Sequence, residues 1–293
     1  MKYLEKHPLI MIVVGVLGIS LSSIFVKYSA APSAVTAALR LLWTVLFLTP
    51  VVFLKPANRR ELFSVSPKQI LLSCLSGLML AIHFVLWFES LRHTSVASST
   101  TIVCTEMIWV ALGFWLLMKG KLRLKAILAM AVAFVGSALI AGGDSVRSDQ
   151  IYGDVLALLA AIAVAGYTLI GRVVRSNLST TVYTYIVYVT CAVVLVLTCF
   201  LQGYHLFAYG AGAIIVGLLL ALFSTILGHS IFSWCLKYFS PAFVSASKLC
   251  EPVVAAIMAG FLFQEIPGFL QIIGCCLILG SVFYYSRIET TNK

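Results

Sequence analysis

Long apolar runs follow one another along the whole chain, and they constrain its fold more than any other feature. Each is close to the 20 or so residues that an α-helix needs to cross the hydrocarbon core of a bilayer. We predict ten spans, at Leu9–Val26, Ala34–Leu54, Ile70–Leu91, Val96–Leu117, Leu124–Ala141, Val155–Ile170, Thr181–Leu201, Gly212–Leu236, Ala242–Phe263 and Phe269–Tyr285. Backbone groups in lipid must find partners within the chain, so these runs must be helices.

The composition agrees with a membrane protein. Of the 293 residues, 61% are apolar and only 10% are charged, which excludes a soluble enzyme, a disordered protein and a disulfide-stapled secreted domain. The sequence has no series of alternating ten-residue segments, as a β-barrel would require. The predicted fold class is therefore an all-α integral membrane protein with short loops and no separate soluble domain.

The basic residues predict how the chain is oriented. With the N-terminus in the cytoplasm, fifteen of the twenty Lys and Arg residues lie in cytoplasmic segments, whereas only Lys27, Arg92 and Arg147 lie outside. The positive-inside rule thus favours ten spans in the cell membrane with both termini cytoplasmic. It places residues 55–68 and 119–125 inside and residues 142–154 outside. The net charge of +10 then reflects topology rather than nucleic-acid binding.

Two other interpretations of local features were weighed. Lys2 and Lys6 precede the first run and Ser29-Ala30-Ala31 follow it, a pattern also found in signal peptides. Removing this run would leave nine spans and break the repeat described next, so we interpret it as a span. The eight cysteines all lie in apolar runs without the spacing of a metal site, so we expect no metal or cofactor.

The two halves of the chain align at a fixed offset of 145 residues. The alignment pairs Lys27 with Arg172 and, within apolar runs, Glu106 with Glu251. We predict two five-helix repeats, residues 1–145 and 146–293. An odd number of helices per repeat inverts the second copy, and inverted repeats are typical of carriers with a binding site near the midplane.

Several short motifs resemble those of the drug/metabolite transporter superfamily, EamA type. They are Ser22–Lys27, Arg40–Leu42, Ser76–Leu78, Ala81–Phe84, Trp87, Ser90–Leu91, Thr94–Ser99, Gly228–Ser230, Trp234, Leu236–Tyr238 and Glu251–Val253. The resemblance implies ten helices, a central cavity lined by helices 1, 3, 4, 6, 8 and 9, and movement of small organic solutes such as amino acids, usually outward. It implies no cofactor. The chain departs from the family pattern at Gly120, where a Glu is usual, and at Glu106-Met107, where Asn or Gln before Pro is usual.

Five ionisable residues lie within or near the ends of spans: Arg40, Glu89, Glu106, Lys248 and Glu251. Charge in the bilayer core is costly, so these side chains should face a partner or a polar site. Lys248 and Glu251 share a helix face and are predicted to pair locally. Arg40 and Glu106 are then candidates for a pair between helices. Both pairs also fit a purely structural role.

The uncharged candidates have alternatives as well. His83 and His229 fit either a hydrogen bond to a neighbouring helix or a proton relay. Ser22, Ser23 and Tyr167 fit either packing or the lining of a site. Trp87 and Trp234 fit either interface anchoring or an aromatic lining. The predicted substrate-binding set is Glu106, Glu251, Lys248, Trp87, Trp234, Ser22, Ser23, His83, His229 and Tyr167.

These features together predict a secondary transporter, with an integral membrane enzyme or a channel as the alternative. Against an enzyme, Asp144, Asp149 and Asp154 are all expected in one outer loop, and the sequence has neither H-E-x-x-H nor a phosphate-binding loop. The expected partners are a small-molecule substrate and the lipid bilayer, and no nucleic acid. Proton coupling, substrate exchange and a homodimer stay open.

Overall fold

Helices make up all the regular structure in the described part of the chain. The computed structural model describes residues 7–94, 96–141, 151–254, 257 and 268–290. In the first half the helices are α2 (Pro8–Ser20), α3 (Ser22–Lys27), α4 (Ser33–Phe53), α5 (Pro56–Phe63), α6 (Pro67–His93), α7 (Val96–Val103), α8 (Glu106–Met118) and α9 (Leu124–Ala141). In the second half they are α10 (Ile151–Val174), α11 (Thr180–Leu201), α12 (Gly210–Leu219), the π-helix η2 (Leu220–Ser230), α13 (Ile231–Cys235), α14 (Pro241–Ser247), the 3₁₀-helix η3 (Lys248–Cys250) and α16 (Phe269–Thr290).

Eight helical segments among the described residues are long and apolar enough to cross a membrane. They confirm eight of the predicted spans, and α9 supplies the fifth as a shorter apolar helix. The predicted ninth span, Ala242–Phe263, falls partly outside the described residues, so the count of ten stays a prediction. Several helices are longer than their apolar runs: α6 starts at Pro67 and α10 extends from Ile151 to Val174.

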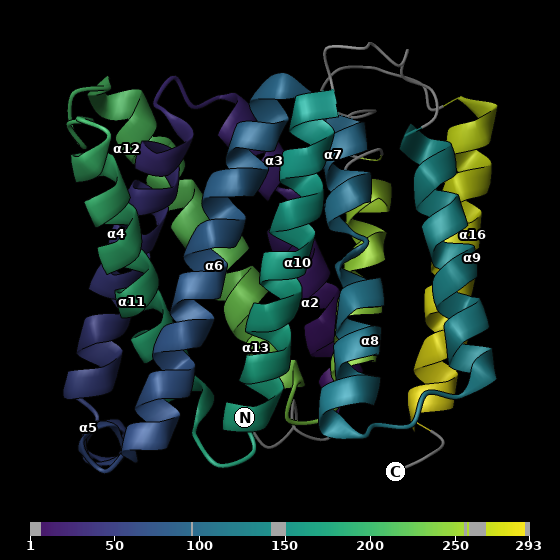
Figure 1. Cartoon of the computed structure of the whole chain (residues 1–293), viewed down its shortest axis with the longest axis horizontal. Helices are drawn as coiled ribbons and strands as arrows, with labels where there is room; N and C mark the ends of the chain where they lie inside the picture. Colours follow the sequence, from purple (N-terminus) through teal and green to yellow (C-terminus); the bar gives the residue numbers. More distant parts are fainter. Residues whose placement is uncertain (1–6, 95, 142–150, 255–256, 258–267, 291–293) are drawn as a thin grey trace.

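The long helices stand roughly parallel and form a bundle, from which one pair is set apart (Figure 1). Within the bundle α6 packs on α10 and α11, α4 packs on α11, and α2 packs on η2. Small residues allow the close α2–η2 contact, since a Cβ on Gly18 would lie 2.7 Å from the backbone carbon of Leu227. The separate pair is α9 and α16, which pack mainly on each other.

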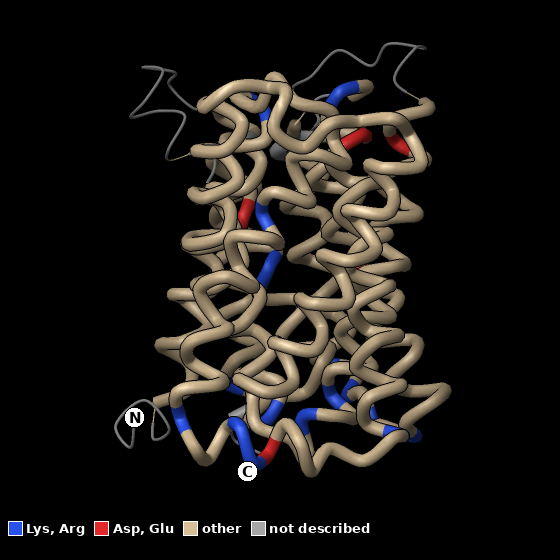
Figure 2. Tube along the Cα trace, turned by 90° about the vertical axis from the view of Figure 1, so that its left-hand side faces the viewer, with Lys and Arg blue, Asp and Glu red and all other residues tan. Residues whose placement is uncertain are grey.

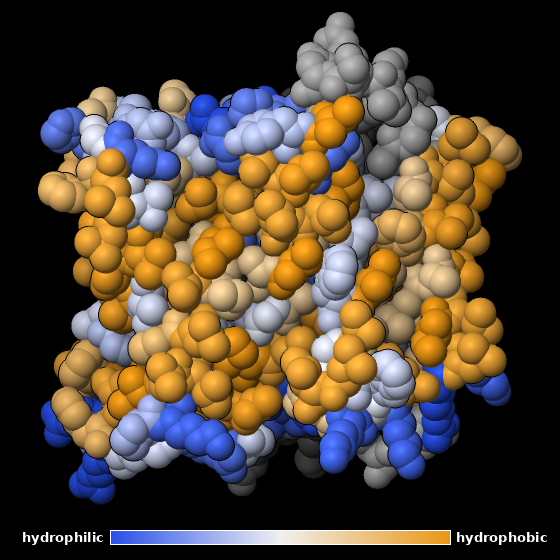
Figure 3. All heavy atoms as spheres, in the orientation of Figure 1, coloured by the Kyte–Doolittle hydropathy of each residue, from blue (hydrophilic) through white to orange (hydrophobic). Residues whose placement is uncertain are grey.

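The surface of the bundle matches a membrane environment. An apolar belt runs between two polar ends in the space-filling view (Figure 3). Lys and Arg gather at the lower end, which carries α5, the α8–α9 connection and the end of α16 (Figures 1 and 2). This distribution agrees with the predicted grouping of basic loops on one side.

Asp154 corrects the prediction that all three aspartates lie in one outer loop. It lies in the first turn of α10, and its Oδ1 accepts hydrogen bonds from Thr94 Oγ1 at 2.9 Å and Ser98 Oγ at 3.0 Å. An acidic side chain is favourable there because the helix N-terminus carries partial positive charge. Asp144 and Asp149 lie outside the described residues.

Two spans are interrupted at positions that the 145-residue offset relates. In the first half, α7 ends at Val103 and α8 begins at Glu106 (Figure 1). In the second half, α14 gives way to the 3₁₀ turn of Lys248–Cys250, and α-helix resumes at Glu251. Each of the two glutamates that this offset pairs is therefore the first residue of an α-helical stretch.

Candidate functional site

An ion pair between two spans lies deep in the bundle. Lys248 Nζ donates to Glu106 Oε1 at 2.7 Å, and Ser245 Oγ donates to the same oxygen at 2.8 Å. The side chains of Lys248 and Glu106 are only 10% and 5% exposed. The pair joins the start of α8 to η3, and Ser245 of α14 adds a hydrogen bond that offsets part of the cost of burying charge.

Glu251 has a different environment, although it is the repeat counterpart of Glu106. It is 8% exposed, and its Oε1 is buried without a hydrogen-bond partner. The predicted local pair of Lys248 with Glu251 is therefore wrong: Lys248 binds Glu106. The three-residue spacing indicates that Lys248 and Glu251 share a helix face. It does not decide whether Lys248 lies closer to Glu251 or to Glu106, because α8 packs against the same face.

Arg40 is completely buried on α4 and binds hydroxyl groups rather than an acid. Its Nε donates to Thr225 Oγ1 at 2.7 Å and its Nη1 to Ser22 Oγ at 3.3 Å. The guanidinium carbon lies 4.1 Å from the centroid of the Phe84 ring, a cation–π contact. Nη2 has no partner. The prediction that Arg40 pairs with Glu106 is thus wrong.

An aromatic cluster adjoins Arg40. The His83 ring stacks on Trp87 with centroids 5.7 Å apart, and His229 lies against Phe84 at 5.3 Å and Tyr167 at 6.0 Å. Trp87 Nε1 and His229 Nδ1 are both buried without a hydrogen-bond partner. His83 Nδ1, by contrast, lies 3.0 Å from the carbonyl oxygen of Ala160.

These groups form one site, which we call the polar centre. It comprises Arg40, His83, Trp87, Glu106, Tyr167, His229, Lys248 and Glu251. Arg40 and Lys248 are both close enough to the two histidines and to Glu251 to interact with them electrostatically. Few other charged residues lie at mid-height between the polar ends of the bundle (Figure 2).

The remaining predicted residues lie in several places. Ser22 is in the site through its bond to Arg40, and Ser23 is buried beside it on α3. Trp234 instead packs against Tyr238 in a tilted arrangement, with ring centroids 4.3 Å apart, and lines a surface cavity with Lys237. This surface setting is compatible with the alternative of interface anchoring, which stays a prediction for Trp234. Glu89 is exposed and pairs with His93 at 3.1 Å.

The polar centre can bind a solute that both donates and accepts hydrogen bonds. Four of its buried polar atoms lack partners: Arg40 Nη2, Trp87 Nε1, His229 Nδ1 and Glu251 Oε1. Unsatisfied buried polar atoms are costly, and they recur where a ligand completes their bonds. Within the residues that the structure describes, no group of three or more His, Cys, Asp or Glu side chains is arranged to hold a metal.

Sequence reasoning missed the π-helix η2, which carries His229 of the polar centre and the hydroxyl partner of Arg40. Residues Leu220–Ser230 form i→i+5 turns, and they contain both Thr225, the partner of Arg40, and His229. Such turns are rare and are frequently found at functional sites. Ser230 Oγ donates to the carbonyl oxygen of Thr225 at 3.1 Å. The sequence signal for this π-helix is the presence of hydroxyl residues at 224, 225 and 230 in an otherwise apolar run. Their side chains can donate to the backbone carbonyls that a π-helix displaces.

Comparison with known proteins gives matches over nearly the whole chain. The model of the EamA-like transporter family matches twice, at residues 7–142 and 151–287. An uncharacterized transporter of Bacillus subtilis is 25% identical over 94% of this chain and 87% of its own length. One from Archaeoglobus fulgidus is 22% identical over 71% of this chain and 72% of its own.

One further relative and one solved structure also match. An uncharacterized transporter of Synechocystis is 23% identical over 70% of this chain, and the match spans 63% of that relative's length. A solved crystal structure shares the fold with a TM-score of 0.77 and 14% identity, covering 98% of this chain and 99% of the other. That level of identity indicates a common fold alone.

Proposed function

Because the chain belongs to the EamA-like transporter family, within the drug/metabolite transporter superfamily, we propose that it moves small organic metabolites across the cell membrane by alternating access. The observation that carries this proposal is the polar centre, to which both halves of the chain contribute unpartnered polar atoms. Arg40 and Trp87 come from the first half, and His229 and Glu251 from the second. A carrier needs such a site between two halves that move relative to each other.

The packing of the helices supports two inverted five-helix repeats. If the 145-residue offset relates α2 to α10 and α6 to the span that contains η2, then the α2–η2 contact is the counterpart of the α10–α6 contact. The α4–α11 and α9–α16 contacts each join a helix to its own counterpart, and the α8–α14 contact joins the fourth predicted span to the ninth. A two-fold axis in the membrane plane has this consequence, and exchange of the two halves would turn an inward-open shape into an outward-open one.

The polar centre favours a substrate with an amino group and an acceptor group. Glu251 presents a carboxylate oxygen to the amine, and Arg40 Nη2 presents an N–H to the acceptor. Amino acids and related metabolites have both groups, and the rings of His83, Phe84 and Trp87 would line an apolar side chain. This is the substrate class that we propose.

Transport could be driven by exchange of substrate or by a proton gradient. A counterflow experiment distinguishes these two energy sources. Purified protein in liposomes loaded with one unlabelled amino acid should accumulate the same labelled solute with no ion gradient, and a panel of amino acids and amines identifies the substrate. An imposed pH gradient then shows whether protons are coupled. Product formation from a lipid without any counterflow would favour the membrane-enzyme alternative instead.

The basic end of the bundle is proposed to face the cytoplasm, which places both termini inside. Single cysteines at Lys121 and Gln202, in a background without the eight native cysteines, test this orientation. Both positions are exposed, at the α8–α9 connection and the end of α11. We expect an impermeant thiol reagent to label position 202 from outside and position 121 only after the membrane is opened. The reverse pattern would overturn the proposed orientation.

A further inference from the structure

Helices α8 and α9 follow each other in the chain and yet leave a groove between them. Its volume is about 1040 Å³, at the upper end of the roughly 300–1,000 Å³ typical of ligand sites. Ala111, Leu112 and Trp115 form one wall, and Ile127 and Ala131 form part of the other. Figure 1 shows α9 and α16 standing apart from α8, and α9 packs mainly on α16. The walls are apolar, and they lie within the apolar belt.

The groove ends at a second, basic cavity. Lys121 and Leu122 line both the groove and a cavity of about 310 Å³, whose other walls include Arg123 and Arg172. One acidic residue, Glu289, also lines this cavity, and its Oε1 accepts a hydrogen bond from the backbone N–H of Ser240. Arg172 is likewise bonded, to the carbonyl oxygens of Leu236 and Phe239, so Lys121 and Arg123 are the basic side chains of this cavity that we consider for a ligand.

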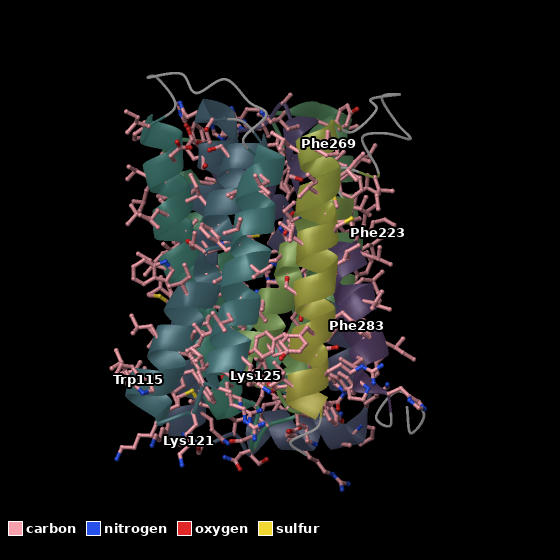
Figure 4. All side chains as sticks on the ribbon, turned by 90° about the vertical axis from the view of Figure 1, so that its right-hand side faces the viewer. Trp115, Lys121, Lys125, Phe223, Phe269 and Phe283 are labelled. Carbon is pink, nitrogen blue, oxygen red and sulfur yellow. The ribbon has the colours of Figure 1, made fainter. Side chains whose placement is uncertain are left out.

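The level of the basic cavity matches the headgroup layer. Trp115 is 59% exposed and lines the groove, and it lies with Lys121 and Lys125 toward the lower end of the bundle (Figure 4). Tryptophan and basic residues gather where hydrocarbon meets headgroups. Basic pockets between spans at this level bind the phosphates of anionic lipids.

We propose that the groove and the basic cavity together form a binding site for one anionic phospholipid. Its acyl chains lie between α8 and α9, and its phosphate lies against Lys121 and Arg123. Charge complementarity selects an anionic lipid, since the cavity has more basic than acidic side chains and the apolar groove opens to the membrane. This site is separate from the polar centre and does not depend on the proposed substrate.

Bound lipid would join two parts of the protein. The inner end of the groove is lined by Met107, the neighbour of Glu106 in the polar centre. Between α8 and α9 the lipid replaces the direct packing that consecutive helices usually make. It thus holds the α9–α16 pair against the rest of the bundle.

Native mass spectrometry of the full chain, released from micelles containing phosphatidylglycerol or phosphatidylcholine, tests the site. We expect wild-type protein to retain one phosphatidylglycerol with roughly tenfold preference over phosphatidylcholine. Changing Lys121→Gln and Arg123→Gln together should abolish the preference. Both side chains are exposed, so the fold should be unaffected. The matched control, Lys55→Gln with Arg59→Gln, removes two exposed charges from the same end and should keep it.

Ala131→Phe provides a second test, because it fills the groove without changing charge. It should reduce retention of phosphatidylglycerol, and thermal unfolding with added lipid gives a reading independent of mass spectrometry. The proposal is overturned by equal retention of both lipids, by preference that survives the Lys121 and Arg123 changes, or by stabilisation with inorganic phosphate that equals that with lipid. A further result would also overturn it: if the protein forms dimers without lipid and Ala131→Phe disrupts them, then a second copy of the chain occupies the groove.

Discussion

The 145-residue offset pairs Glu106 of the first half with Glu251 of the second, and the two acids differ in what they bind. Both are buried, and both start a helical stretch after an interruption. Glu106 accepts hydrogen bonds from Lys248 and Ser245, whereas Glu251 Oε1 has no partner. One lysine, present in only one half, breaks the symmetry of the pair. The comparison indicates that one acid holds the helices together and the other is left for a ligand.

The largest effect that we expect is on stability, from separating the ion pair. Glu106→Gln leaves Lys248 buried without a countercharge, which should cost about 3–5 kcal/mol in the free energy of unfolding. Lys248→Met should cost a similar amount because it strands Glu106. Thermal unfolding in detergent measures both. The double variant should recover part of the loss, and strictly additive losses would contradict a direct pair.

The second prediction concerns function rather than stability. Glu251→Gln should abolish counterflow of an amine substrate while changing the free energy of unfolding by less than about 1 kcal/mol, because no bond within the protein is lost. The same purified samples serve for both measurements. Equal stability losses in Glu106→Gln and Glu251→Gln would remove the distinction between the two acids.

Hydropathy predicted most of the fold because the hydrocarbon core of a bilayer fixes both the length and the apolar composition of a spanning helix. The runs that became α4, α6, α10 and α11 were found with errors of a few residues at their ends, where polar turns extend the helices beyond the apolar part. The burial of Glu106 and Glu251 also followed from position alone. Their different partners did not, because a pair between helices depends on which faces pack together.

The π-helix η2 shows another limit of sequence reasoning. A π-helix adds residues per turn, so it changes which side chains of 220–230 face inward. Arg40 was expected to bind an acid but binds Thr225 on this segment. Hydrophobic periodicity assumes regular α-helix and so cannot place residues across such a segment.

A third prediction tests whether the π-helix positions Arg40. Thr225→Val removes the acceptor of the Nε hydrogen bond and leaves a buried charged donor unpaired, which should cost about 1.5–3 kcal/mol and raise KM for counterflow. The control is Thr44→Val, whose hydroxyl donates to the backbone oxygen of Arg40 in its own helix, at 2.8 Å. It should cost less than about 1 kcal/mol. Similar losses in the two variants would show that Arg40 does not depend on the π-helix.

The smallest expected effect separates the two tryptophans. Trp87→Phe keeps an aromatic ring but removes an unpartnered N–H, so it should raise KM several-fold, by about 1 kcal/mol of binding, with little change in stability. Trp234→Phe should leave KM unchanged, since that residue packs against Tyr238 and lines a cavity with Arg175 and Lys237. Counterflow with a range of substrate concentrations measures both, and a larger effect from Trp234→Phe would contradict the assignment of the site.

Labelling with a hydrophobic carbodiimide tests the central claim most directly, because the reagent adds to buried carboxyl groups that are not held in an ion pair. Peptide mass spectrometry then locates the adduct in wild-type protein, with and without the solute that counterflow identifies. We expect the adduct on Glu251 and not on Glu106, and we expect the transported solute to prevent it. An adduct on Glu106, or labelling of Glu251 that the solute does not change, would contradict the assignment of Glu251 as the acid that binds substrate.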